Sequence, residues 1–156
     1  MLLKNRVRFV SILVLLIYIF LLLKLVVFKG GVSELAAHFN NDGISPVKPL
    51  KHNFIPFRTI GYYVSMKEPF DVAVRNVLGN MLLFIPYGFI LPAAFSMLHR
   101  FVPLVLTVAF TSLFFELLQA VTRLGSFDVD DLILNTAGGI TGWLMFKLLG
   151  KMVGTY

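Results

Sequence analysis

Seven polar side chains lie inside or at the edges of strongly apolar stretches of this chain, and within each stretch they recur at helical spacing. They are Asn76 and Asn80, then Ser112, Glu116 and Gln119, then Asp131 and Asn135. A carboxylate or amide inside a lipid bilayer is costly, so each needs a hydrogen-bonding partner, water or a functional role. Amides and carboxyl groups at one depth can hold hydroxyl or amide groups of a ligand, and the acids can transfer protons.

Two of the groups extend into continuous stripes along their helices. The stripes are Ser112, Glu116 and Gln119, spaced i, i+4, i+7, and Asp128, Asp131 and Asn135, spaced i, i+3, i+7. Residues at these spacings share one side of a helix. Both stripes should face the interior of a helical bundle, because lipid offers them no hydrogen bonds. Asp130 lies off its stripe, and we expect it to be solvated.

Glu116 is the strongest candidate for proton chemistry. Removal from water would favour the neutral form of its carboxyl group and so allow proton exchange near neutral pH. The cations expected near it at the rim are Arg58, Arg75 and Arg123. A structural alternative is that Glu116 pairs with Arg123 and so stabilises the packing of the helices.

Structural roles are also open for the other polar residues. Asp128 and Asp131 stand at the start of an apolar run, where a carboxylate can cap a helix and favours its positive end. Asn76, Asn80 and Asn135 can serve as hydrogen bonds between helices, each contributing roughly 0.6 to 2 kcal/mol. Three asparagines, one glutamine and two acids at one depth favour a recognition site over these separate roles.

The elements that must position these residues are membrane-spanning helices. Hydrophobic residues make up 58% of the 156 residues, well above the ~45–50% of soluble domains. The apolar runs 9–28, 77–98, 101–121 and 129–149 each reach the ~20 residues that cross a bilayer as a helix. We therefore predict an all-α polytopic bundle of about four transmembrane helices, forming one domain over 1–156. Successive spans alternate in direction, so the three polar groups should share one side of the membrane.

The first run sets the expected orientation. Lys4, Arg6 and Arg8 precede it, as they would in a cleaved signal peptide. We expect an uncleaved anchor instead, because the apolar core is long and no small-residue cleavage site follows it directly. Of the 14 lysines and arginines, six then fall inside and eight outside, but the first helix usually dominates orientation. The prediction is a multi-pass protein of the cell membrane with both termini cytoplasmic and the polar groups outside.

The segment 29–75 should then be extracytoplasmic. Its first part, 30–49, is rich in turn-forming residues. Its second part mixes aromatic and basic residues, a combination that suits the lipid headgroup layer. We interpret this part as a re-entrant or surface flap over the polar groups, the alternative being an ordinary loop with a few anchoring aromatic residues.

The connections and the small residues predict how the helices pack. Little more than His99 and Arg100 separates the second and third runs, which predicts a tight antiparallel hairpin. Gly138, Gly139 and Gly142 place small residues at i, i+4 in the last run, a pattern that permits close contact between helices.

Composition argues against several chemistries. The chain has no cysteine, which excludes disulfides and thiolate chemistry. His38, His52 and His99 are scattered, so no zinc-type pair exists, and no metal site or cofactor is predicted. A divalent cation held by Glu116, Asp128 and Asp131 is the weaker alternative. The net charge of +6 favours anionic lipid headgroups, and no nucleic-acid partner is expected.

Three stretches of the chain resemble the VanZ-like family of bacterial membrane proteins. The stretches are Asn53 to Ile60, Asn76 to Asn80 continuing to Gly88, and Glu116 to Gln119 followed by Phe127 to Asp131 and by Asn135 to Gly138. The resemblance implies a helical integral membrane protein of the cell envelope, with resistance to the glycopeptide teicoplanin as the family label. By matching position, the polar motif of the family falls on Asn53, Arg58, Asn76, Asn80, Glu116, Gln119, Asp128, Asp131 and Asn135.

The leading functional hypothesis is an outward-facing site for a polar group of a lipid-linked or wall-associated ligand, or of a lipoglycopeptide. Arg58 and Arg123 would meet phosphate or carboxylate. The remaining ligand-binding candidates are Asn53, Asn76, Asn80, Gln119, Asp128 and Asn135. The alternative is a membrane enzyme acting on an envelope lipid or peptide, with Glu116 and Asp131 as an acid/base pair. A proton-coupled transporter is the third hypothesis, although no polar path descends through the spans.

Overall fold

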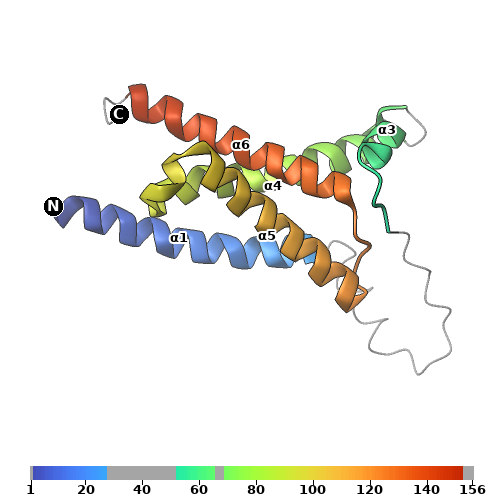
Figure 1. Ribbon diagram of the computed structural model, residues 1–156, viewed down its shortest axis with the longest axis horizontal. Helices are drawn as coiled ribbons and strands as arrows, with labels where there is room; N and C mark the ends of the chain where they lie inside the picture. Colours follow the sequence, from blue (N-terminus) through green and yellow to red (C-terminus); the bar gives the residue numbers. More distant parts are fainter. Residues whose placement is uncertain (1, 28–51, 66–68, 153–156) are drawn as a thin grey trace.

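The computed structural model describes residues 2–27, 52–65 and 69–152, and within these ranges the regular elements are helices. They are α1 (Leu2–Val27), α3 (Arg58–Val64), α4 (Phe70–Ala94), the short 3₁₀ helix η1 (Ser96–His99), α5 (Phe101–Thr122) and α6 (Val129–Met152) (Figure 1). Four of them, α1, α4, α5 and α6, are long and apolar enough to cross a membrane. The predicted all-α membrane bundle is confirmed.

The bounds of α4 differ most from the sequence expectation. The helix begins at Phe70, directly after Pro69, rather than at residue 77. Its first turns carry the charged residues Asp71 and Arg75, which pair with each other. Because both residues are charged, the sequence does not show this part of the helix as an apolar run. Helices α5 and α6 start at residues 101 and 129, as expected.

Alternation of the long helices gives the bundle two distinct ends. Figure 1 shows the start of α1 and the end of α6 together at one end, which we call the terminal end. The end of α1, the start of α4, the end of α5 and the start of α6 meet near α3 at the other end, which we call the α3 end. All three polar groups predicted from the sequence therefore lie at the α3 end.

Helices α4 and α6 pack backbone against backbone. A Cβ atom added to Gly142 would lie 1.9 Å from the carbonyl oxygen of Ile85, and one added to Gly138 would lie 2.1 Å from that of Met81. Contacts this short exclude any side chain larger than hydrogen unless the helices separate. The close contact predicted from the small residues of α6 is confirmed, and α4 is the partner helix.

The expected tight hairpin between the second and third spans is wrong in detail. Helix α4 ends at Ala94, two residues after Pro92, and η1 fills most of the connection to α5. The His99 ring bonds the carbonyl oxygen of Pro92 through Nε2 at 2.9 Å. This longer connection leaves room for α6, rather than α5, to be the principal neighbour of α4.

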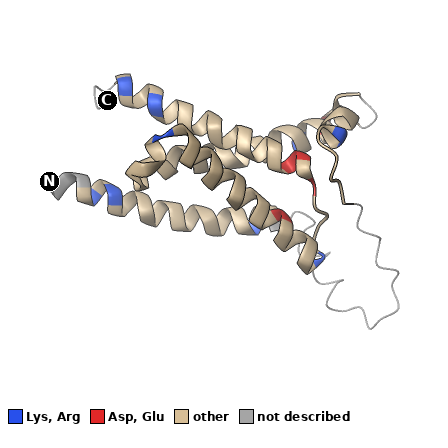
Figure 2. Ribbon diagram, viewed as in Figure 1, with Lys and Arg blue, Asp and Glu red and all other residues tan. Residues whose placement is uncertain are grey.

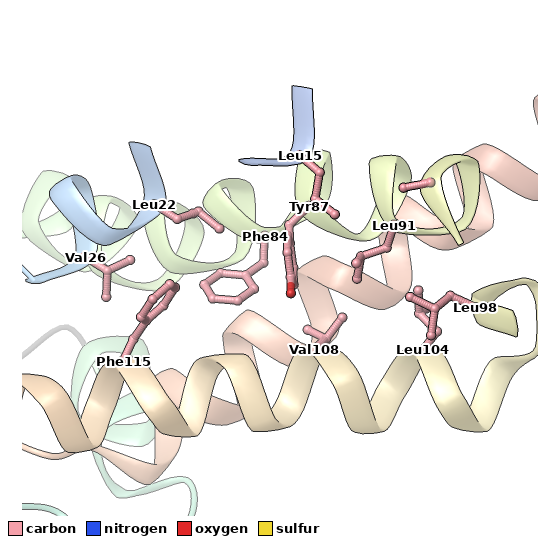
Figure 3. Close-up of a cluster of buried hydrophobic side chains, with 11 residues drawn as sticks. Leu15, Leu22, Val26, Phe84, Tyr87, Leu91, Leu98, Leu104, Val108 and Phe115 are labelled. Atoms are coloured by element: carbon pink, nitrogen blue, oxygen red, sulfur yellow. The ribbon is translucent and has the colours of Figure 1, made fainter. Parts of the chain in front are cut away.

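An apolar core fills the space between α1, α4 and α5 (Figure 3). Its buried members are Leu15, Leu22 and Val26 of α1, Phe84, Tyr87, Leu91 and Ala94 of α4, Leu98 of η1, and Leu104, Val108 and Phe115 of α5. Two hydroxyl groups add polar ties within this layer: Tyr18 donates to the carbonyl oxygen of Leu83 at 2.8 Å, and Tyr87 shares a 2.8 Å bond with Thr111. The core thus holds the helices whose ends carry the polar residues.

Candidate functional site

The polar side chains predicted from the sequence turn inward at the α3 end. Asn80, Ser112, Glu116, Gln119 and Asn135 are each at most 6% exposed, and Asn76 and Asp131 are half-buried. This burial agrees with the expectation that lipid cannot satisfy their hydrogen bonds.

Two hydrogen bonds between side chains tie α6 to its neighbours at this depth. The amide of Asn80 on α4 donates to Asp131 on α6. The amide of Asn135 on α6 donates to the hydroxyl of Ser112 on α5 at 2.9 Å. The asparagines therefore act as interhelical ties, which was the structural role left open for Asn80 and Asn135.

The two long polar residues of α5 hold the ends of neighbouring helices. Oε2 of Glu116 accepts the backbone N–H of Asp128 at 2.9 Å, at the start of α6. Nε2 of Gln119 donates to the carbonyl oxygen of Val26 at 2.7 Å, in the last turn of α1, where backbone carbonyls lack partners within their own helix. Glu116, the residue first expected to carry protons, thus fixes the residue that precedes α6.

The segment before α4 is attached to the α5–α6 connection by backbone and side-chain bonds. Asn53 forms an isolated parallel bridge with Asp128: its N–H donates to Phe127 O at 2.8 Å, and its carbonyl accepts from Val129 N at 3.0 Å. The side-chain amide of Asn53 donates to Asp128 Oδ1 at 2.9 Å. The Thr59 hydroxyl donates to Asp128 Oδ2 at 2.7 Å. Residues 52–65, the α3 segment, therefore form an ordered cover over the start of α6, as the flap interpretation expected.

Asp130 contradicts the expectation of a solvated side chain. It is fully buried, and its carboxylate accepts the backbone N–H groups of Phe57 at 2.5 Å, Thr59 at 2.6 Å and Ile60 at 3.0 Å. The first amides of α3 need an external acceptor, because Phe57 stands at the N-cap and has no side-chain oxygen. The lack of a capping side chain at Phe57 was the one sequence signal that could have suggested an acceptor from another part of the chain.

Asp128 has the capping role considered for it and also lies beside a cleft. Its Oδ1 accepts the backbone N–H of Asp130 at 2.8 Å, in the first turn of α6. This is the geometry of a helix cap. The same carboxylate bonds Asn53 and Thr59 and lies along a cleft.

This cleft lies between α3, α4, the α5–α6 connection and the start of α6, and its volume is 350 Å³. Its polar lining includes Thr59, Tyr63, Asn76, Gln119, Ser126, Asp128 and Asp131. The volume lies near the lower end of the ~300–1,000 Å³ that small-molecule sites occupy. Two of its lining side chains are carboxylic acids, and none of the described residues that line it is lysine or arginine.

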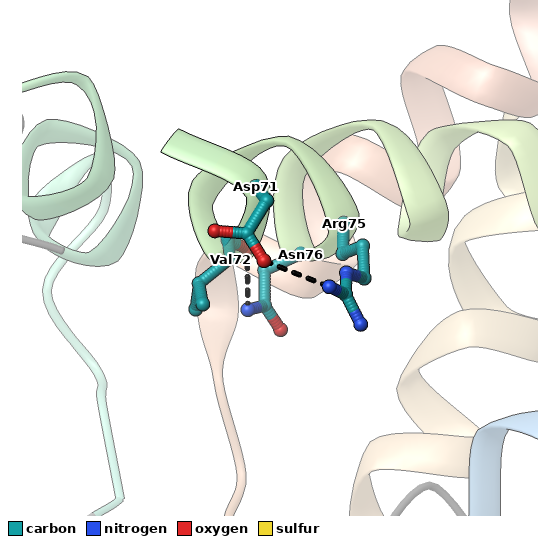
Figure 4. A network of polar contacts seen from close by, with 4 residues as sticks. All are labelled: Asp71, Val72, Arg75 and Asn76. Atoms are coloured by element: carbon teal, nitrogen blue, oxygen red, sulfur yellow. Dashed lines mark hydrogen bonds and ion pairs between the residues drawn. The ribbon is translucent and has the colours of Figure 1, made fainter. Parts of the chain in front are cut away.

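Charged residues are distributed unevenly around this site. Figure 2 shows that the acidic residues of the described part of the chain gather at the α3 end. The arginines expected there lie outside the cleft lining: Arg58 and Arg123 are exposed, and Arg75 pairs with Asp71 at 2.7 Å (Figure 4). Arg58 instead borders a separate surface groove of 360 Å³ beside Tyr62 and Tyr63.

Asn76 sits at the edge of the cleft rather than in the interhelical network. Its side-chain amide donates to the carbonyl oxygen of Val72 in its own helix at 2.9 Å (Figure 4). The orientation of the Asn76 side chain is therefore set by a hydrogen bond within α4 and not by a bond to another helix. Among the described residues, Glu116, Asp128 and Asp131 do not form a cluster suited to holding a metal ion.

Comparisons with known proteins place this arrangement in a family. A family model described as VanZ/LLP1 matches residues 12–150, a range that contains every residue of the site. Protein VanZ of Enterococcus faecium is 31% identical over 99 residues, which are 64% of this chain and 54% of that protein. The chain thus spans about half the length of this curated relative. No solved structure matches the chain.

Proposed function

The chain belongs to the VanZ/LLP1 family, and from that premise we propose a cell-envelope membrane protein whose cleft binds a polar group of an envelope ligand. The ligand classes are a lipid-linked or wall-associated molecule and a lipoglycopeptide. Binding at the outer surface would change the access of glycopeptides to their target and so contribute to teicoplanin resistance, the phenotype that the family resemblance implies.

The observation that carries this proposal is the convergence of polar groups from four separate chain segments on one cleft. Thr59 comes from α3, Asn76 from α4, Gln119 from α5 and Asp131 from α6. Asn80, Ser112 and Asn135 do not line the cleft and serve helix packing, Asn80 through its bond to Asp131 and the other two through their bond to each other. Groups that border the cleft remain at a surface that a ligand can reach.

The charge of the lining narrows the ligand chemistry. Asp128 and Asp131 border the cleft without a described basic side chain in its lining. Carboxylates accept hydrogen bonds, most strongly from cationic donors. The lining therefore favours amine, amide or hydroxyl groups of a peptide or sugar portion over phosphate, which would meet like charge.

The positions of the two candidate acid/base residues support ligand binding better than they support catalysis. Asp131 borders the cleft, whereas Glu116 is 1% exposed and holds the backbone of Asp128. A general acid and base must both come within hydrogen-bond reach of the reacting group. Only one of the pair is so placed.

The proposal includes an orientation in which the α3 end is extracytoplasmic. At the terminal end lie Arg6, Arg8, Arg100, Lys147 and Lys151, and none of the acidic residues in the described ranges is found there. Short segments on the cytoplasmic side of membrane proteins are enriched in lysine and arginine. Arg6 and Arg8 at the start of α1 support both termini in the cytoplasm, because the first helix usually dominates orientation.

The proposal is tested by Asp131→Asn in a bacterial host whose teicoplanin susceptibility is measured with and without the expressed chain. We expect the parent to raise the inhibitory concentration and the variant to lose most of that increase, since one charge-assisted hydrogen bond is worth about 1.5–3 kcal/mol, or at least tenfold in affinity. Asp71→Asn is the matched control, because Asp71 is an exposed acid at the same end that pairs with Arg75.

Expression and melting temperature are measured for both variants in detergent. Full resistance in a well-folded Asp131→Asn variant would contradict the assignment of the cleft to this phenotype. Equal losses in both variants would also contradict it, because a general effect of surface charge would then suffice.

A further inference from the structure

Another concave feature lies at the opposite end of the bundle and differs in chemistry from the cleft. It is a groove of 440 Å³ between α1, the end of α4, η1 and the start of α5. Its lining is largely apolar and includes Ile12, Leu16 and Ile19 of α1, Leu91 of α4 and Met97 of η1. The basic side chain that borders it is Arg8 of α1.

The α1 residues of this groove form one line along the helix. Arg8, Ile12, Leu16 and Ile19 are spaced i, i+4, i+8, i+11 and therefore share a side of α1. The distance along the helix from Arg8 to Ile19 is about 16 Å at the rise of an α-helix. This matches the ~15 Å that one leaflet contributes to a hydrocarbon core of ~30 Å. The groove therefore runs from the headgroup level to the middle of the bilayer.

The positive charge at the terminal end complements the negative charge of anionic lipids. Arg8 lies in the first turn of the membrane-spanning part of α1, which begins at Asn5, and its long side chain can extend to the headgroups. Arg6 and Arg100 add positive charge at the same end. Acidic side chains are not found at this end in the described ranges, so the local field attracts anions.

From this geometry we infer that the groove holds an acyl chain of an anionic phospholipid of the leaflet at the terminal end, with the phosphate bound by Arg8. The apolar lining supplies contacts along the chain, and the guanidinium group supplies hydrogen bonds that match phosphate oxygens. This lipid would be a fixed part of the packing between α1 and the connection from α4 to α5. The inference stands apart from the cleft and from the proposed role in resistance.

The test is native mass spectrometry of the full chain purified in detergent and titrated with phosphatidylglycerol or phosphatidylcholine. We expect one phosphatidylglycerol to be retained in preference to phosphatidylcholine. Arg8→Gln should lower that retention about fivefold, the effect of one basic residue near anionic headgroups. Lys151→Gln is the matched control, because it removes the same charge at the same end from outside the groove lining.

A second variant separates the acyl groove from the headgroup contact. Ser96→Trp places a large side chain at an exposed position of the groove lining, so it should reduce retention of both lipids while keeping Arg8. Equal retention by Arg8→Gln and Lys151→Gln would overturn the inference, as would full retention by Ser96→Trp. A dimer that Ser96→Trp disrupts, without selective lipid retention by the parent, would show that a second copy of the chain occupies the groove.

Discussion

Gly142→Ala should lower the free energy of unfolding of the bundle by about 3 kcal/mol or more, at the upper end of what overpacking costs. The added methyl group would lie 1.9 Å from the carbonyl oxygen of Ile85 and 2.8 Å from the backbone nitrogen of Phe89. Both atoms belong to the backbone of α4 and cannot move aside by a rotamer change. Helix α6 would have to shift away from α4 along their whole contact, loosening the bond between Asn80 and Asp131.

The measurement is thermal unfolding in detergent, followed by the loss of monodisperse protein. Gly79→Ala provides a matched control, since a Cβ atom at that position of α4 meets no atom within 4 Å. Removing a glycine from a helix interior is otherwise favourable by roughly 0.5–1 kcal/mol. We therefore expect the control to melt at or slightly above the parent temperature; equal melting of the two variants would show that α4 and α6 are not in backbone contact.

Asp130→Asn should release the α3 segment from the start of α6 while leaving the membrane-spanning helices folded. The carboxylate accepts three backbone N–H groups of the turn into α3. An asparagine side chain offers a single neutral oxygen and presents an N–H₂ group to donors, so at least one amide loses its partner. The expected cost is about 3 kcal/mol, from the loss of hydrogen bonds to a charged group.

Amide hydrogen exchange measures this cost directly at Thr59 and Ile60. Exchange there should accelerate by about a hundredfold or more in Asp130→Asn, the rate equivalent of that energy. Exchange in the middle of α5 should be unchanged. Asp71→Asn is the control, because it removes an exposed acid from the same end. If α3 amides remain as protected in Asp130→Asn as in the parent, the carboxylate does not hold the segment.

The convergence of the polar stripes could be predicted because it follows from two properties that are local in the sequence. Spacing by three and four residues places Ser112, Glu116 and Gln119 on one side of a helix, and alternation of spans brings such sides to one end. The contact between α4 and α6 was predictable for a similar reason, since Gly138 and Gly142 recur one turn apart. Neither inference needs knowledge of how distant segments dock.

The parts that sequence reasoning missed depend on such docking. Asp130 accepts bonds from residues 70 to 73 positions earlier in the chain, and nothing in the pattern of α6 shows that α3 covers its first turn. Glu116 could be placed at the right depth, but its bond to the amide of Asp128 depends on the path of the connection between α5 and α6. Arg58 and Arg123 were expected at the polar groups because of their sequence positions, yet both point to exposed surface.

The docked α3 segment also explains why the cleft exists at all. Thr59 and Ile60 form one wall, and both residues are positioned by Asp130, while Thr59 also bonds Asp128. The opposite wall is the start of α6, fixed to α5 by Glu116 through the amide of Asp128. The buried acids thus shape the cleft, and the half-buried Asp131 borders it at the place where the proposed ligand would bind.

The most direct test of the central claim is cysteine labelling from outside the cell. The chain has no cysteine of its own, so Ser126→Cys in the cleft and Ser96→Cys at the terminal end each give a single reactive thiol. With a membrane-impermeant maleimide, we predict that Ser126→Cys is modified in intact cells and that Ser96→Cys is modified only after the membrane is opened. Modification of Ser96→Cys alone in intact cells, or no modification of Ser126→Cys under either condition, would contradict an outward-opening cleft.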